Sequence, residues 1–180
     1  TEQGDILPGD LRMSAADMQF VQQGREYILK KALTPLREKY DYIIIDSPPA
    51  LGIITVNALT AADSILVPII ADRYSLQGLT QLSGTIATVR EYSNPQLEIA
   101  GILLTRFNER TILARDIQDI IKEVADSWDT KVFKSTIRQS VALPESQTQQ
   151  ESIFTYAPES TTAEDYNSFI DEFLEGENNG

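Results

Sequence analysis

The sequence predicts an α/β fold: a mostly parallel sheet with helices on both of its faces. Two observations support this class. Short continuous apolar runs at residues 41–46, 64–70 and 97–105 are typical of strands that are buried on both faces. The segments between them repeat apolar residues at the spacing of amphipathic helices. Strands and helices that alternate with short links favour a parallel sheet with right-handed crossovers.

The N-terminal part of the chain is expected to be helical before its first strand. A helix is predicted over residues 14–39, with Ser14 as its N-cap and an interruption near Gly24. The run DYIIID at residues 41–46 then predicts a buried strand that ends in a carboxylate.

The middle of the chain predicts two further strands. A short helix around Leu59 precedes the apolar run SILVPII at residues 64–70. The next helix ends before the turn at residues 93–95, and a strand at 97–105 follows it. Its apolar residues recur at helical spacing: Leu76, Leu79, Leu82, Ile86 and Val89.

The C-terminal part predicts a helix at residues 111–127, a short strand at 131–136 and a last helix. Thr161 and Glu164 resemble a capping box in front of that helix. Its predicted apolar face consists of Tyr166, Phe169, Ile170, Phe173 and Leu174.

Length and composition indicate one globular domain. With 180 residues, 42% of them apolar, the chain can bury a core, and no repeat or linker divides it. We therefore expect residues 1–180 to form a single domain, with a disordered tail at residues 175–180. No apolar run is long enough to cross a bilayer, and residues 1–20 lack the pattern of a signal peptide, which favours a cytoplasmic protein.

Two missing residue types exclude several kinds of site. Because the chain has no cysteine, it can form no disulfide, zinc–cysteine site or iron–sulfur cluster. Because it has no histidine, it lacks the commonest general base and metal ligand. A metal would have to bind oxygen ligands, which favours Mg²⁺.

The net charge of −12 is unevenly distributed along the chain. Residues 141–180 hold nine acidic residues and no basic one. Residues 105–138 hold seven basic residues against six acidic ones, which permits a local basic face that could bind nucleic acid.

The strongest local motif is the strand at residues 41–46 followed by Ser47, Pro48 and Pro49. Proline cannot continue a sheet ladder, so Asp46 is expected at the carboxyl end of a strand, where ligands of such sheets bind. An aspartate in this position holds Mg²⁺ in P-loop NTPases. A core strand that stops at a polar residue would explain the motif equally well.

The wider sequence resembles the ParA/Soj family of chromosome and plasmid partition ATPases. The stretch YDYIIIDSPPALGIITVNAL at residues 40–59 is similar to the family's Walker B region. Other similar segments follow in family order and cover nearly the whole chain: LPGD at 7–10, REY at 25–27, LKKAL at 29–33, VPI at 67–69, LQGL at 76–79, LTRFNERT at 104–111 and YAPES at 156–160.

This resemblance implies a P-loop NTPase-like fold that binds ATP and Mg²⁺. It also implies a glycine-rich P-loop of the deviant Walker type, which these residues do not contain, because no glycine is followed by lysine. We expect that loop, with roughly the first third of the domain, to lie outside the 180 residues. The isolated chain is then expected to bind ATP poorly and to expose strand edges and apolar faces.

The resemblance assigns further nucleotide contacts. Asp46 would hold Mg²⁺ and help to position the attacking water, and Ser47 and Pro48 would belong to the loop that senses the γ-phosphate. Asn108 could hydrogen-bond adenine, and Arg106 could stack on it or reach phosphate; the alternative is that this segment is only a turn before the next helix.

Other assigned positions have alternatives that the sequence leaves open. Pro144 lies in the segment that encloses the base, although the family's usual Glu-Ala-Pro-Ser is Leu-Pro-Glu-Ser here. Asn57 either stabilises the loop after Asp46 or caps a helix, and Asp72 is either a ligand-edge carboxylate or a solvated one.

The family also implies DNA and protein partners. Arg110 and Arg138 are similar in placement to residues that grip DNA phosphates without reading sequence, and solvated surface arginines are the alternative. ATP would drive homodimerisation on the nucleoid, and a ParB-type partner would stimulate hydrolysis, in a bacterial or mobile-element system. Two alternatives remain: a non-catalytic adaptor with the same fold, and a MinD-like ATPase, which the acidic C-terminal segment disfavours because MinD needs a basic amphipathic helix for the membrane.

Overall fold

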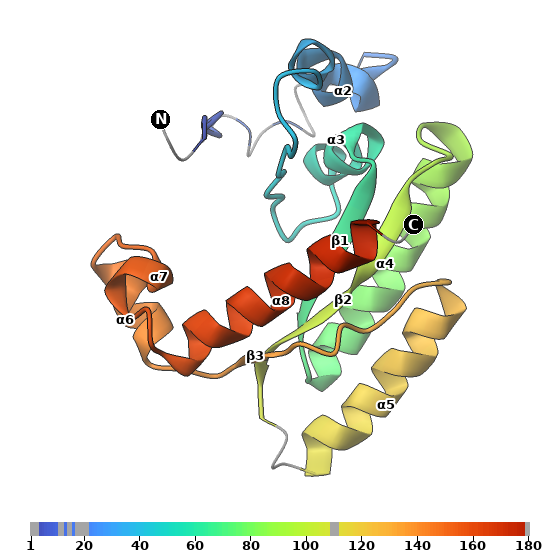
Figure 1. Ribbon diagram of the computed structural model, residues 1–180. Helices are drawn as coiled ribbons and strands as arrows, with labels where there is room; N and C mark the ends of the chain where they lie inside the picture. Colours follow the sequence, from blue (N-terminus) through green and yellow to red (C-terminus); the bar gives the residue numbers. More distant parts are fainter. Residues whose placement is uncertain (1–3, 11–12, 14–15, 17–21, 109–111, 179–180) are drawn as a thin grey trace. The chain divides into compact units, whose positions relative to one another are not determined.

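The computed structural model describes residues 4–10, 13, 16, 22–108 and 112–178. Two compact units make up the chain, and each is described by itself: residues 1–63 with 81–97, and residues 64–80 with 98–180. The described elements follow one another in this order (Figure 1): η2 Arg25–Tyr27, α2 Ile28–Leu33, η3 Thr34–Leu36, α3 Ile53–Ala61, β1 Ser64–Ile70, α4 Arg73–Tyr92, β2 Glu98–Phe107, α5 Ile112–Ser127, β3 Ile137–Arg138, α6 Ala142–Thr148, α7 Ile153–Tyr156 and α8 Thr161–Asn178.

A parallel sheet of strand order β1-β2-β3 forms the centre of the second unit. β1 pairs with β2 from Ser64 opposite Glu98 to Ile70 opposite Thr105. The predicted strands at residues 64–70 and 97–105 are therefore confirmed, and so are the predicted helices that follow each of them, α4 and α5.

One face of the sheet is covered by α8, which crosses the strands in Figure 1. Leu103, Phe133 and Ile137 form a buried cluster, and Phe169 contacts it edge-on, with ring centroids of Phe133 and Phe169 5.0 Å apart. Tyr166 and Phe173 pack there as well. Three residues of the predicted apolar face thus form the contact, whereas Ile170 and Leu174 are exposed.

The opposite face of β2 is equally buried. Ile102 and Leu104 alternate with Leu103 along the strand and are fully buried. α5 contacts β2 and buries Ile117 and Ile121. A parallel sheet flanked by helices confirms the predicted fold class.

The predicted strand at residues 131–136 is displaced toward the C-terminus. Val132 forms only an isolated parallel bridge with Ile102, and the ladder resumes at β3. Between them, the backbone N–H groups of Lys134 and Ser135 donate to the Glu172 carboxylate of α8, at 2.9 and 2.8 Å. The ladder is interrupted because a side chain of α8 takes the N–H groups that a strand would donate.

The prediction of a buried strand at residues 41–46 is wrong for this structure. The segment has no regular secondary structure, and Ile44 is 92% exposed. No described residue forms a ladder with it. A strand needs a neighbour to take its backbone hydrogen bonds, so an apolar run alone does not establish one.

Residues 14–15 and 17–21 of the helix predicted over residues 14–39 lie outside the described residues, and residues 25–36 form three short elements instead of one helix. Gly24 has φ 81° and begins η2, which confirms an interruption at this glycine. α2 then spans only Ile28–Leu33. The predicted N-cap Ser14 lies outside the described residues.

The start of α8 corrects the predicted capping box by one residue. The Ser160 hydroxyl, rather than that of Thr161, accepts the backbone N–H of Ala163 at 3.2 Å. Ser160 is therefore the N-cap, and the third helical residue is Ala163 rather than Glu164.

Two asparagines tie the first unit together. Asn57 of α3 accepts the N–H of Leu29 at 3.1 Å and donates to the carbonyl of Arg25 at 2.9 Å. Asn94 donates to the carbonyls of Leu59 and Ala62, at 3.0 and 2.7 Å. Asn57 thus holds the first turn of α2 rather than the loop after Asp46.

Candidate functional site

The carboxyl end of β2 is distorted in a way that redirects a predicted site residue. Thr105 pairs with Ile137 and Phe107 with Arg138, so Arg106 is the extra residue of a bulge. Its φ of 49° is in the left-handed region, which non-glycine residues seldom adopt. Such distortions concentrate at functional sites, and this one lies at the edge where parallel sheets bind ligands.

A pocket of about 640 Å³ lies next to this bulge, within the second unit. It is lined by residues from the end of β2, the segment around β3 and α8: Phe107, Asn108, Ser135, Thr136, Arg138, Gln139, Asp165 and Ser168. Its volume falls in the range of small-molecule sites. The predicted base-contacting residue Asn108 is therefore part of a concave site.

Arg138 and Asp165 form the strongest polar contact of this pocket. The Asp165 carboxylate accepts the backbone N–H of Arg138 at 2.9 Å and its Nη2 at 2.6 Å. Nε of Arg138 lies 3.0 and 2.9 Å from the two carboxylate oxygens. The Asp165 side chain is only 10% exposed, so this is a partly buried, two-pronged ion pair.

The remaining lining groups are neutral. Asn108 and Gln139 contribute amides, and Ser135, Thr136 and Ser168 contribute hydroxyls. Asp165 and, at 3.8 Å from Nη2, the exposed Glu164 balance Arg138, so the pocket presents hydrogen-bonding groups without a net positive charge. Such a lining suits an uncharged polar ligand better than a phosphate.

Two other predicted nucleotide contacts lie outside the pocket lining. Arg106 is exposed, and Pro144 is exposed in the first turn of α6. The segment expected as a base-enclosing loop is helical from Ala142 onward. Arg110, the other predicted DNA contact, lies outside the described residues.

The predicted metal-binding segment belongs to the first unit. Asp46, Ser47 and Pro48 are all exposed. The turn after them is held by the buried Thr55, whose hydroxyl donates to the carbonyl of Ala50 at 2.6 Å. An accessible carboxylate fits Mg²⁺, which takes one or two carboxylates and fills its other positions with water and phosphate oxygens. No group of three or more acidic side chains able to hold a metal occurs in the part of the chain that the structure describes.

Asp72 caps the start of α4. Its carboxylate accepts the N–H of Ser75 at 2.8 Å, as an N-cap of α4 does. That hydrogen bond is the main cause that lowers the pKa of Asp72. The structure thus gives Asp72 a role as a helix cap, which is neither of the two alternatives that the sequence left open.

Sequence reasoning missed most of the pocket. Ser135, Thr136, Gln139, Asp165 and Ser168 come from two segments about thirty residues apart, and no spacing pattern links them. The sequence contains only weak evidence for Asp165, namely that it is an acidic residue shortly after the start of a predicted helix.

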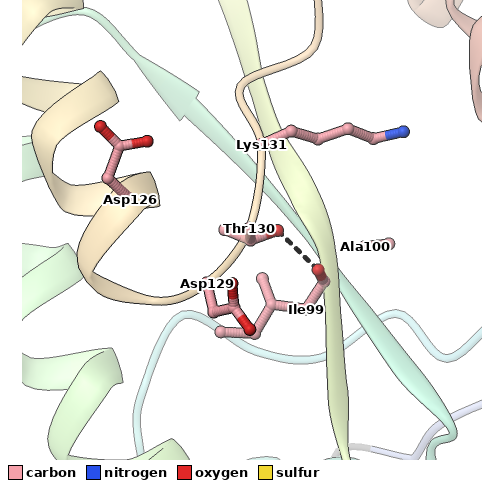
Figure 2. A pocket seen from close by; sticks show the side chains of 6 residues that line it. All are labelled: Ile99, Ala100, Asp126, Asp129, Thr130 and Lys131. Carbon is pink, nitrogen blue, oxygen red and sulfur yellow. Dashed lines mark hydrogen bonds between the residues drawn. The ribbon is translucent and has the colours of Figure 1, made fainter.

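A second pocket lies near the opposite end of β2 (Figure 2). It has a volume of about 480 Å³ and is lined by Ile99, Ala100, Asp126, Asp129, Thr130 and Lys131. The Thr130 hydroxyl, which would be its main neutral polar group, already donates to the carbonyl of Ile99 at 2.6 Å. Because Ile99 lies at the amino end of its strand, this pocket is not at the edge where such sheets bind ligands.

No helix among the described residues is both long and apolar enough to cross a membrane.

Comparison with known proteins shows similarity to partition proteins. A family model described as an AAA domain matches residues 1–99. The sporulation initiation inhibitor protein Soj of Bacillus subtilis (strain 168) is 41% identical over 163 residues, which are 90% of this chain and 63% of Soj. The chromosome partitioning protein ParA of Myxococcus xanthus (strain DK1622) is 40% identical over 89% of this chain and 56% of its own length. The chain thus spans between half and two thirds of these relatives.

Solved structures show the same similarity of fold. Cobyrinic acid a,c-diamide synthase from Mycobacterium smegmatis aligns with a TM-score of 0.74 and 32% identity, over 93% of this chain and 61% of its own. A second structure of that enzyme, with bound ATP analog and magnesium, aligns with a TM-score of 0.65 and 36% identity, over 74% of this chain and 53% of that one.

Proposed function

Because this chain belongs to the AAA-domain family that includes the Soj and ParA partition ATPases, we propose that it is part of an ATPase that moves chromosomal or plasmid DNA to daughter cells. The observation that carries the proposal is the pocket beside the β2 bulge, because it contains Asn108 at the carboxyl edge of a parallel sheet. The similar enzyme with a bound ATP analog and magnesium supports the choice of ligand.

Each predicted site residue has a role in this proposal. Asn108 hydrogen-bonds the base, and Arg106, at the bulge that ends β2, stacks on the base or reaches a phosphate. Ser47 and Pro48 sense the γ-phosphate, and Pro144 approaches the base. Asp46 binds Mg²⁺, which supplies charge stabilisation for the transferred phosphoryl group.

The proposed cycle uses ATP as a timed switch. Binding of ATP produces a homodimer that binds DNA without sequence preference, which places the protein on the bacterial nucleoid. A ParB-type partner stimulates hydrolysis, and hydrolysis releases the dimer. Arg110 is the first candidate for the DNA contact. Arg138, the second, is half exposed and already bound to Asp165.

Asp46 provides the test of the ATPase proposal. Asp46→Asn in the full-length protein is expected to lower kcat for Mg²⁺-dependent ATP hydrolysis about 100-fold, because the amide is a poor ligand for Mg²⁺. Steady-state phosphate release at saturating DNA and partner measures the effect. Asp41→Asn is the matched control, since Asp41 is an exposed aspartate of the same segment.

The outcome separates the ATPase from its alternatives. Equal phosphate release by Asp46→Asn and Asp41→Asn would contradict the role of Asp46 as a metal ligand. A wild-type protein that shows neither Mg²⁺-ATP binding nor hydrolysis would favour a non-catalytic adaptor. ATP hydrolysis that is stimulated by a carboxylate substrate, and not by DNA with a partner, would favour an amide-forming enzyme like the similar cobyrinic acid a,c-diamide synthase.

A further inference from the structure

We propose that Asp165 is a positioning residue that holds Arg138 as one wall of the pocket, so that the pocket accepts an uncharged ring and rejects phosphate. The uncharged ring is the base of the nucleotide, so this inference rests on the proposed function. It gives Arg138 a role in the pocket in place of contact with DNA.

The geometry of the pair supports a fixed wall rather than a transient surface contact. Asp165 binds both the backbone and the guanidinium of Arg138, so the residue is held at two points. Nη2 of Arg138 also donates to the carbonyl of Thr161 at 3.2 Å. An arginine held in this way cannot swing toward a distant phosphate without leaving a nearly buried carboxylate unpaired, which is costly.

The pair also joins the two structural elements that form the pocket. Arg138 ends β3, opposite Phe107 at the end of β2, and Asp165 lies in the first turns of α8. Both side chains line the pocket. The ion pair therefore fixes the distance between the sheet edge and the helix on either side of the ligand.

Charge balance determines which part of a nucleotide fits. A guanidinium alone would attract phosphate oxygens, whereas a guanidinium neutralised by Asp165 leaves a wall that can stack on a planar ring. The amides of Asn108 and Gln139 supply both donors and acceptors for the edge of that ring.

Glu172 offers a matched control on the same helix. Its carboxylate accepts the N–H groups of Lys134 and Ser135, so it also ties α8 to the segment before β3. Glu172 does not line the pocket. A change at Glu172 thus disturbs the same contact between elements without changing the charge of the pocket wall.

The test measures the two ends of the nucleotide separately in the full-length protein. Adenosine and inorganic tripolyphosphate each displace a fluorescent ATP analogue, and their inhibition constants are compared for wild type, Asp165→Asn, Arg138→Gln and Glu172→Gln. Asp165→Asn is expected to weaken adenosine binding about tenfold, because the guanidinium loses its closest counter-charge and is held less firmly, although Glu164 still lies 3.8 Å from Nη2. Tripolyphosphate should bind Asp165→Asn at least as well as wild type, and Glu172→Gln should leave both constants unchanged.

Other results would overturn the inference. If Asp165→Asn and Arg138→Gln bind adenosine as wild type does, the pair does not shape the base pocket. If Asp165→Asn binds both adenosine and tripolyphosphate more weakly than wild type, and Glu172→Gln does the same, the ion pair only stabilises the fold. If Arg138→Gln loses DNA binding but keeps its affinity for adenosine, Arg138 contacts DNA rather than shaping the pocket. A wild-type protein that does not bind the ATP analogue would overturn the proposed function itself.

Discussion

One position of β2, Gly101, has no room for a side chain because the strand packs directly against the ring of Phe133. Gly101 lies within β2 with φ 154°, and a Cβ at this position would be 2.5 Å from Cε2 of Phe133. The ring of Phe133 is buried against Phe169 and Phe173, and Nζ of Lys131 lies 4.9 Å from its centroid. The ring therefore has little room to move, and glycine is required by packing.

This contact predicts the effect of adding one methyl group. Gly101→Ala is expected to lower the free energy of unfolding by about 2 kcal/mol, because the new Cβ overlaps a ring that is packed on its other sides. Urea denaturation of the full-length protein measures the change. Gly84→Ala is the control, since nothing lies within 4 Å of its added Cβ in α4, and it should be neutral or stabilising. Equal effects of the two substitutions would contradict the packing argument.

At the scale of residues, the sequence could predict only those site residues whose evidence lies within one short segment of the chain. Asn108 was assigned from the family resemblance of the short segment that follows an apolar strand, and the structure places it in the lining of a pocket. Asp165 and Ser168 could not be found this way, because their place in the site depends on how α8 packs across the sheet. The same limit applies to Arg138, whose ion pair joins positions 27 residues apart.

At the scale of elements, the apolar patterns located two strands and two helices correctly, although β1 is buried on one face only. β1, β2, α4 and α5 appear where their apolar patterns indicate. The two strands that did not form as predicted are those at residues 41–46 and 131–136; the first has an apolar run like that of β1, whereas the second has only Val132 and Phe133. What they lack in the structure is a continuous ladder partner, and a pattern along one chain does not contain that information.

The contact between α8 and the segment before β3 also predicts a pH dependence. Burial raises the pKa of Glu172, but the N–H groups of Lys134 and Ser135 outweigh it, so the net pKa lies below the ordinary value of 4.5. A carboxyl whose pKa is lower in the folded state stabilises the fold above its unfolded pKa and loses this contribution as the pH falls through its folded pKa. The contribution of Glu172 should therefore be complete at pH 7 and decline below about pH 4.5.

Substitution of Glu172 tests this expectation. Glu172→Ala should lower the free energy of unfolding by about 1–2 kcal/mol at pH 7, because two backbone N–H groups lose their acceptor. The difference from wild type should shrink as the pH falls below 4.5. Hydrogen exchange supplies a local readout: the amides of Lys134 and Ser135 should exchange faster. A difference that is constant from pH 7 to pH 3 would contradict the assignment.

At the scale of the whole molecule, exposed apolar residues favour self-association of the chain, whereas its net charge opposes it. Tyr42, Ile43 and Ile44 are 55%, 37% and 92% exposed and adjacent in sequence. Contiguous exposed apolar segments of this kind promote pairing with another chain. The net charge of −12 opposes association, because like-charged molecules repel one another at low ionic strength.

This balance predicts that the 180-residue chain by itself self-associates, and more strongly as salt is added. Ionic strength near 0.5 M screens the repulsion beyond about 4–5 Å but leaves apolar contacts intact. Sedimentation velocity at low and high salt measures the shift from monomer to larger species. Ile44→Glu should reduce association, because it places a charge at the most exposed residue of the segment. Val141→Glu adds the same charge at an apolar residue outside the segment that is 74% exposed, and it should reduce association less. If both substitutions act equally, the effect comes from net charge alone, and residues 42–44 are not the interface.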